Sequence, residues 1–290
     1  TDSPLHQLVE GFPDVQHHKT DVFRERVDYS RELKARLAEA RKQGVDAVRE
    51  VRVALGSLED EDLGVLVDLF LSFRAVEAWD DMIALQADMP SPLGRTVMIR
   101  EQLGLALNRA GRDDEAERVL EELIEERGPS SETYGILGRV HKDRWQRARE
   151  ASDHVAARGH LRRAVAAYRA GFEADWRDAY PGVNAVTLME VQEPPDPERT
   201  KLVPVVRYAV ERRVASGRPD YWDHATRLEL AVLGRDEEGA EDALADALPL
   251  VREPWEPKTT LRNLRLIREA RERRGDAEGW ERRIEDELDR

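Results

Sequence analysis

The stretch REQLGLALNRAGRDDEAERVLEELIEERGP, residues 100–129, decides the fold of this chain. Its apolar and small residues recur at helical spacing on both sides of a short turn, at Leu103, Leu107, Ala116, Leu120 and Leu123. Gly111 marks the end of a first helix, and the acidic run after it favours the start of a second, because negative charge stabilises a helix N-terminus. The stretch therefore predicts two helices that form a hairpin, with Gly104 allowing their close approach.

The same pattern returns when the sequence is shifted by 34 residues, the length of one tetratricopeptide repeat. Leu69, Leu103 and Leu137 then share one position of three successive first helices, and Phe73 and Leu107 share another. The helix–turn–helix unit resembles the tetratricopeptide repeat. We therefore predict an all-α, tetratricopeptide-like right-handed α-solenoid of about seven helical hairpins.

Prolines and glycines divide the chain into the expected helices. The predicted pairs are 20–43 with 45–55, 59–73 with 76–88, 93–110 with 113–127, 131–147 with 157–174, 181–191 with 198–216, 220–233 with 236–250, and 258–274 with 276–289. Residues 1–19 have no period and are predicted as an extended lead-in or linker. Residues 20–290 are predicted as a single tetratricopeptide-like domain, most regular over 59–175.

The repeat that starts near residue 131 is longer than the others. About 14 extra residues, around WQRAREASDHVAARGH at 145–160, separate the expected small position from its match at Ala164. Insertions of this kind in repeat proteins tend to lie on one face and often bind partners. The sequence leaves two interpretations open, a lengthening of the two helices and a loop that binds a partner.

Composition narrows the functional classes. The formal net charge is −14, so we expect no nucleic-acid partner, since an acidic surface repels phosphates. Two basic runs near the C-terminus, 271–274 and 282–283, are interleaved with acids and indicate a solvent-exposed, ion-paired face.

The chain has no cysteine, and no apolar stretch approaches the length of a membrane span, so we expect a cytoplasmic protein with no cofactor and no membrane contact. The histidines are not spaced for a metal site, and none is predicted.

Three blocks of sequence are distinctive: LGRVHKD at 137–143, YRAGFE at 168–173 and YPGVNAVTL at 180–188. In this order they resemble the "TRAF-binding" tetratricopeptide region of the apoptosis-signal-regulating kinases, a branch of the mitogen-activated protein kinase kinase kinases. The resemblance implies a regulatory scaffold that couples a sensor domain to an effector. The Arg-, Ala- and Asp-rich composition indicates a bacterial relative. The chain has no Gly-rich loop, HRD or DFG signature, so any kinase would be another domain or protein.

A small basic and polar groove is the candidate binding site. In some tetratricopeptide proteins, Lys, Arg and Asn on successive first helices bind an acidic or C-terminal peptide through charge-assisted hydrogen bonds. The residues here that match this role are Arg139, Lys142, Asn184, Lys201 and Arg207. The alternative interpretation is local: Lys142 and Asp143 pair with neighbours, and Asn184 bonds to nearby backbone.

No nucleophile–base arrangement or nucleotide-binding motif is present, so the chain is not predicted to be an enzyme. We predict a non-catalytic scaffold for a protein or peptide partner, or for an adjacent domain of the parent protein. The alternatives are a homo-oligomerisation module and, with less support from the sequence, a helical-repeat enzyme or a nucleic-acid binder.

Ser130 and Ser131 are expected to cap a helix. Five tryptophans are expected to pack at helix junctions: Trp145, Trp176, Trp222, Trp255 and Trp280.

Overall fold

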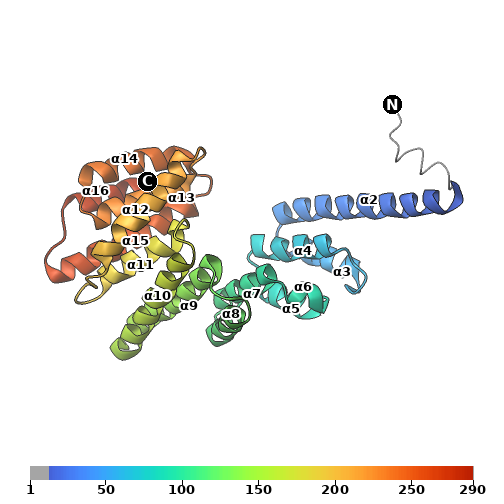
Figure 1. The fold of residues 1–290 in the computed structure, drawn as a ribbon, viewed down its shortest axis with the longest axis horizontal. Coiled ribbons are helices and arrows are strands. Elements are labelled where there is room, and N and C mark those ends of the chain that lie inside the picture. The colour runs from blue at the N-terminus through green and yellow to red at the C-terminus, as the bar shows by residue number, and fades with distance from the viewer. Residues whose placement is uncertain (1–12, 290) are drawn as a thin grey trace. The chain divides into compact units, whose positions relative to one another are not determined.

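The computed structural model describes residues 13–289, with side chains from residue 27 onward. Every regular element in this part of the chain is a helix, as Figure 1 shows. The residues group into two compact units, 1–112 and 113–290, and each unit is described by itself. The all-α fold predicted from the repeat is confirmed, whereas the prediction of one continuous domain stays a prediction.

Unit 1 contains α2 (Pro13–Gln43), α3 (Val45–Leu55), α4 (Leu63–Ala75), α5 (Trp79–Asp88), α6 (Ser91–Gly94) and α7 (Val97–Arg109). Unit 2 contains α8 (Asp113–Arg127), α9 (Ser131–Glu150), α10 (His154–Ala174), α11 (Ala179–Val191), α12 (Arg199–Ala215), α13 (Tyr221–Leu233), α14 (Glu237–Ala247), the 3-10 turn η1 (Leu248–Leu250), α15 (Trp255–Arg274) and α16 (Trp280–Leu288). The predicted helices are present, with ends displaced by a few residues.

The predicted extended lead-in over 1–19 needs a correction. Residues 13–19 form the first part of α2, because proline is tolerated at the first position of a helix, where its missing N–H has no partner to lose. Residues 1–12 lie outside the described part of the chain.

The repeat positions inferred from the 34-residue shift are core positions. Leu69, Leu103 and Leu137 are all buried, and so are Phe73 and Leu107. In unit 1, the aromatic and aliphatic side chains of α4 pack against α2, α3 and α5 in one cluster. Burial of each large apolar side chain stabilises the fold by about 1.5–3 kcal/mol, so the period read in the sequence is the period of the core.

Helix ends carry the expected local signals. Gly111 has a φ of 77°, the left-handed conformation that ends α7, and its N–H donates to the carbonyl of Asn108. The hydroxyl of Ser130 accepts a hydrogen bond from the backbone N–H of Thr133 at 3.0 Å, which confirms the predicted cap of α9. Asp220 caps α13 in a reciprocal capping box with Asp223.

The insertion at 145–160 lengthens two helices. α9 and α10 are 20 and 21 residues long, and only residues 151–153 separate them. The apolar side of the extension is used, since Trp145 is buried and Arg149 lies over its ring at 5.1 Å. Of the two interpretations left open by the sequence, the structure has the helix extension.

Glycines of the distinctive blocks allow helices to pack at close range. A Cβ added at Gly138 of α9 would lie 2.7 Å from the ring of Tyr168, which α10 buries against this position. A Cβ added at Gly182 of α11 would lie 2.7 Å from Val206 and 2.8 Å from Phe172. These blocks are therefore distinctive largely because they set the spacing between α9, α10, α11 and α12.

The helices α9, α11, α13 and α15, each the first of a hairpin, line the interior of unit 2. α11 packs against both α13 and α15, although α15 lies two hairpins further along the sequence. α15 therefore returns to the earlier first helices, and this return positions the polar groups described next.

Candidate functional site

Four polar side chains from four helices meet inside unit 2. The ammonium of Lys142 on α9 donates to the Oδ1 atoms of Asn184 on α11, at 3.3 Å, and of Asn263 on α15, at 2.9 Å. The Nδ2 of Asn263 donates in turn to both carboxylate oxygens of Glu229 on α13, at 3.0 and 3.2 Å. We call Lys142, Asn184, Glu229 and Asn263 the inner polar cluster.

Burial shifts both ionisable groups of the inner polar cluster toward neutrality. Loss of hydration lowers the pKa of Lys142 to about 8, although the charge of Glu229 opposes this shift. Loss of hydration likewise raises the pKa of Glu229 to about 7, against the hydrogen bond from Asn263 and the charge of Lys142. Both pKa values lie within about one unit of neutral pH, so Lys142 and Glu229 can each change protonation state there, and Asn263 is hydrogen-bonded to both.

The structure brings part of the predicted set together. Lys142 and Asn184 are bonded, and Arg139, one turn earlier on α9, is close enough to affect the charge of Lys142. Asn184 also donates to the carbonyl of Tyr180 at 2.9 Å, which is the local contact that the alternative interpretation expected. A partner carboxylate at Lys142 would have to compete with Asn184 and Asn263 for the same donor.

The other two predicted residues lie on α12 and have separate partners. Lys201 is exposed and pairs with Glu198 at 2.7 Å. Arg207 is half-buried, and its guanidinium donates to the carbonyl of Leu230 at 3.4 Å. The five residues therefore occupy an interior cluster on α9 and α11 and two separate positions on α12, and their role in binding a partner stays a prediction.

A buried ion network was missed in the sequence. Arg271 is 1% exposed and donates to Oε1 of Glu190 at 3.0 Å and to Glu281 at 2.6 Å. Arg274 donates to the same Oε1 of Glu190, and Arg199 donates to its Oε2. Burial raises the pKa of Glu190, but the hydrogen bonds from Arg271 and Arg199 outweigh it, and the pKa is lowered overall.

The solvent-exposed face predicted for 271–274 is therefore wrong at Arg271. Its side chain follows Leu264 and Ile267 at helical spacing on the buried stripe of α15. That spacing was the available signal, and the mixture of Arg and Glu over 271–274, which is typical of an exposed helix face, concealed it. Arg273, in the same run, is exposed and paired with Glu193, as the prediction expected.

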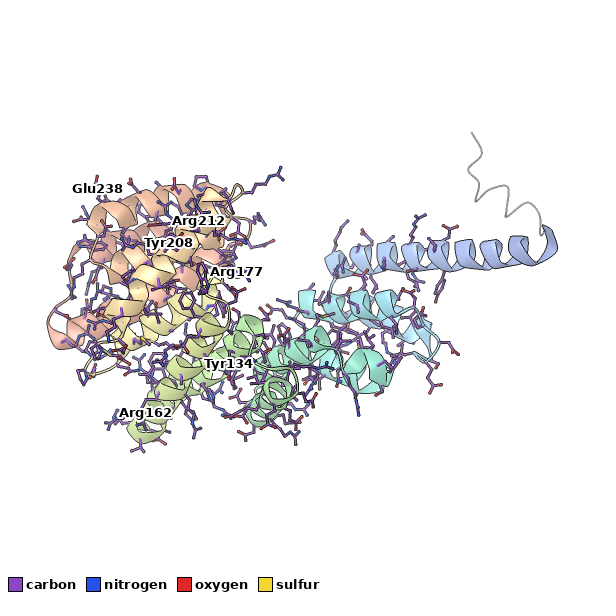
Figure 2. All side chains as sticks on the ribbon, viewed as in Figure 1. Tyr134, Arg162, Arg177, Tyr208, Arg212 and Glu238 are labelled. Atoms are coloured by element: carbon purple, nitrogen blue, oxygen red, sulfur yellow. The ribbon has the colours of Figure 1, made fainter. Side chains whose placement is uncertain are left out.

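Exposed aromatic rings form a hollow on the outside of unit 2. Trp176, in the loop between α10 and α11, stacks with Tyr208 of α12 with ring centroids 6.5 Å apart and planes inclined by 27°. The hollow has a volume of about 460 Å³ and is lined by Trp176, Arg177, Tyr208, Ala209, Arg212 and Arg213. In Figure 2, the labels of Arg177, Tyr208 and Arg212 fall in one region of this unit.

The tryptophans divide between core and surface. Trp145 is buried and Trp280 is half-buried against the core of unit 2, as expected for residues at helix junctions. Trp176, Trp222 and Trp255 are exposed, yet each packs against another ring near a helix start: Trp176 against Tyr208, and Trp222 against Tyr221 and Trp255. Sequence alone could not separate the two groups, because all five lie near helix ends.

Within the described part of the chain, no helix is long and apolar enough to cross a membrane. Among the same residues, no group of three or more His, Cys, Asp or Glu side chains is placed to hold a metal ion.

These helical hairpins, packed in succession around shared apolar clusters, define a helical-repeat protein of the tetratricopeptide type. A solved thermophilic TPR protein from Thermus thermophilus has the same fold, with a TM-score of 0.51 at 13% identity over 70% of this chain and 99% of that one. The family model described as the MAP3K TRAFs-binding domain matches residues 3–286, and the chain belongs to this family. The resemblance found in the three sequence blocks is thereby confirmed.

Two further comparisons, one with a curated protein sequence and one with a solved structure, cover different shares of the proteins compared. The mitogen-activated protein kinase kinase kinase nsy-1 of Caenorhabditis elegans is 27% identical in an alignment 219 residues long, and the alignment covers 69% of this chain and 14% of the nematode protein. A tetratricopeptide repeat protein from Parabacteroides merdae aligns with 84% of this chain and 98% of its own, at 12% identity and a TM-score of 0.39. The chain thus spans about one seventh of the curated kinase that it matches.

Proposed function

We propose that this chain is a non-catalytic protein-interaction module that couples a sensor domain to an effector in a signalling or stress-response protein. The observation that carries the proposal is the family match, which extends over residues 3–286 and so includes nearly all of the chain. The nematode relative is named as a kinase kinase kinase, and this segment is a small part of it. An effector kinase domain outside the segment is consistent with that proportion.

The fold supports the same proposal on physical grounds. Helical hairpins that each contact mainly their neighbours leave a large surface for their size, and that surface is what repeat proteins use for binding. Unit 2 presents exposed aromatic side chains, which are enriched at protein interfaces because they bury much area with few rotatable bonds. The partner is a protein, a peptide or an adjacent domain of the parent protein.

Affinity capture tests the proposal. The tagged chain is used as bait in lysate of the organism that encodes it, beside an unrelated tetratricopeptide domain as control bait, and bound proteins are identified by mass spectrometry. We expect proteins that are enriched on this chain and absent from the control, with a sensor- or kinase-containing protein among them. Identical protein sets on both baits would contradict the proposal.

The predicted groove residues are tested in the same experiment. The variant Arg139→Glu/Lys142→Glu reverses two charges at the inner polar cluster, and its circular dichroism must first match that of the parent chain. Loss of a partner from this folded variant would support peptide binding in the interior of unit 2. Retention of every partner would place the interaction elsewhere on the molecule.

A further inference from the structure

We infer that the outward face of α12, together with the Trp176 hollow, is a docking surface for an acidic peptide segment that carries an apolar side chain. The surface consists of Trp176, Arg177, Lys201, Val205, Tyr208 and Arg212, and we call it the α12 face. This inference rests on the proposed function, because it assigns the interaction to one surface and its partner to one chemical class.

The apolar part of the α12 face is large and exposed. Trp176 is 51% exposed, Tyr208 is 55% exposed and Val205 is 44% exposed. On α12, Lys201, Val205, Tyr208 and Arg212 are separated by four, three and four residues, the spacing that places side chains on one side of a helix. A contiguous apolar patch with a charged rim on an otherwise polar surface is typical of an interaction site.

Three arginines line the hollow beside the rings, Arg177, Arg212 and Arg213, and two of them are ion-paired, as is Lys201 with Glu198. Arg177 pairs with Asp175 at 2.8 Å, and Arg213 pairs with Asp223 at 3.1 Å. The side chain of Arg212 is exposed and, within the residues that the structure describes, its guanidinium forms no ion pair or hydrogen bond with the protein. Arg212 thus presents a free guanidinium beside two aromatic rings, in a chain whose formal net charge is −14.

This combination selects an acidic peptide over the other occupants. A carboxylate can accept two parallel hydrogen bonds from a guanidinium such as that of Arg212, while an apolar side chain packs in the hollow against the rings of Trp176 and Tyr208 that line it. A second copy in a symmetric dimer would place the α12 face against itself and bring like charges together. A nucleic acid would have to approach a strongly acidic chain for the sake of a few arginines.

A fluorescence anisotropy titration of the full chain tests the inference. The probe is a fluorescein-labelled synthetic peptide rich in Glu and Asp, with Leu residues at helical spacing. The control peptide has Gln and Asn in place of every Glu and Asp. We expect saturable binding of the acidic peptide alone, weakened about tenfold or more in Trp176→Ala/Tyr208→Ala and in Arg212→Glu.

Matched variants separate the α12 face from general effects of charge and aromatic surface. Trp255→Ala removes an equally exposed ring, since Trp255 is 56% exposed, and Arg162→Glu reverses an exposed charge on α10. Figure 2 labels Arg162 in a different region of unit 2 from Arg212. We expect both variants to bind the acidic peptide as the parent chain does.

Fluorine NMR locates the bound peptide directly. In the chain labelled with 5-fluorotryptophan, the resonance absent from Trp176→Phe belongs to Trp176. We expect the peptide to shift this resonance and to leave that of buried Trp145 in place. A shift of other tryptophans alone would overturn the inference.

Three results of the titration overturn the inference: no saturable binding up to about 1 mM chain, equal binding of the uncharged peptide, or equal binding by the α12-face variants. Self-association that Tyr208→Ala abolishes, seen by sedimentation, would replace the acidic peptide with a second copy. Capture of natural partners is a separate measurement. Partners retained by Trp176→Ala/Tyr208→Ala would leave the proposed function standing while the α12 face fails.

Discussion

At Gly138 the chain has room for a hydrogen atom but not for a methyl group. We expect Gly138→Ala to lower the free energy of unfolding by about 1–3 kcal/mol, because the added Cβ would lie 2.7 Å from the ring of buried Tyr168 and one helix must shift. Urea denaturation followed by circular dichroism measures the change.

A matched glycine on the neighbouring helix supplies the control. Gly159 lies inside α10, and a Cβ added there has no neighbour within 4 Å. Gly159→Ala should therefore stabilise the chain by about 0.5–1 kcal/mol, since alanine loses less backbone entropy in a helix. Equal effects of the two substitutions would contradict the packing role assigned to Gly138.

The buried side chain of Arg271 leads to a second stability prediction at a single residue. Arg271→Met keeps much of the length of the side chain but leaves the buried carboxylate of Glu281 without its cation, so we expect a loss of about 3–5 kcal/mol. Arg273→Met, which removes an exposed ion pair with Glu193, should cost less than about 1 kcal/mol. The free energies of unfolding are measured with urea as the denaturant. Guanidinium chloride is not used, because it is a salt and would screen the ion pairs under test.

At the scale of a helix, the cap of α9 is a local device that can be tested alone. Ser130→Ala removes the acceptor for the Thr133 N–H, and we expect it to lower the free energy of unfolding by about 0.5–2 kcal/mol. Ser130→Asn keeps an acceptor of similar reach and should stay within a few tenths of a kcal/mol of the parent. If the alanine and asparagine variants have the same free energy of unfolding, the hydrogen bond of the cap does not stabilise the helix.

The helices themselves were predictable because their signals are local. Prolines, glycines and acidic starts lie within one turn of the helix ends, and the apolar period persists over three repeats. The insertion at 145–160 was not decided by sequence, because its residues suit either a long helix or a polar loop. In the structure both helices are extended, and Trp145 is buried in one cluster with Ala157 and Leu161 of α10.

The candidate site was predictable only in part, because some of its residues are far apart in the sequence. Lys142 and Asn184 were placed on successive first helices as part of one groove, and their side chains are in contact, whereas their role in binding a partner stays a prediction. Asn263 and Glu229 were missed because Lys142 and Asn263 are 121 residues apart, and no periodic pattern connects two positions that meet only when α15 returns to α11. The exposure of Trp176 and Tyr208 was also not predictable, because it depends on how the helices of unit 2 pack.

At the scale of the whole molecule, the inner polar cluster makes stability depend on pH. Because the pKa of Glu229 is raised from 4.5 to about 7 by folding, the folded state holds a proton that the unfolded state has lost between these values. The contribution of Glu229 to the free energy of unfolding is therefore fully present below pH 4.5 and is lost as the pH rises through 7. The lowered pKa of Lys142 acts in the opposite direction, with stability gained as pH rises from about 8 to 10.5.

Glu229→Gln isolates the acidic half of this dependence. Glutamine keeps the shape and an acceptor for Asn263 but does not titrate, so the variant should gain stability relative to the parent chain between about pH 5 and pH 7.5, by up to about 3 kcal/mol. Urea melts of both proteins at the two pH values measure the difference. Parallel pH profiles would show that Glu229 titrates in the folded chain as it does in water.

The return of α15 to α11 also bears on how unit 2 folds. In an open repeat array each hairpin contacts only the next, contacts are short in sequence, and the ends can melt while the middle persists. Here Glu190 and Arg271 meet across 81 residues and Lys142 and Asn263 across 121, which raises the contact order of the unit. The last hairpin must therefore be synthesised and docked before the interior polar groups find partners, so unit 2 should fold more slowly than an open array of equal length and lose its structure in one cooperative step.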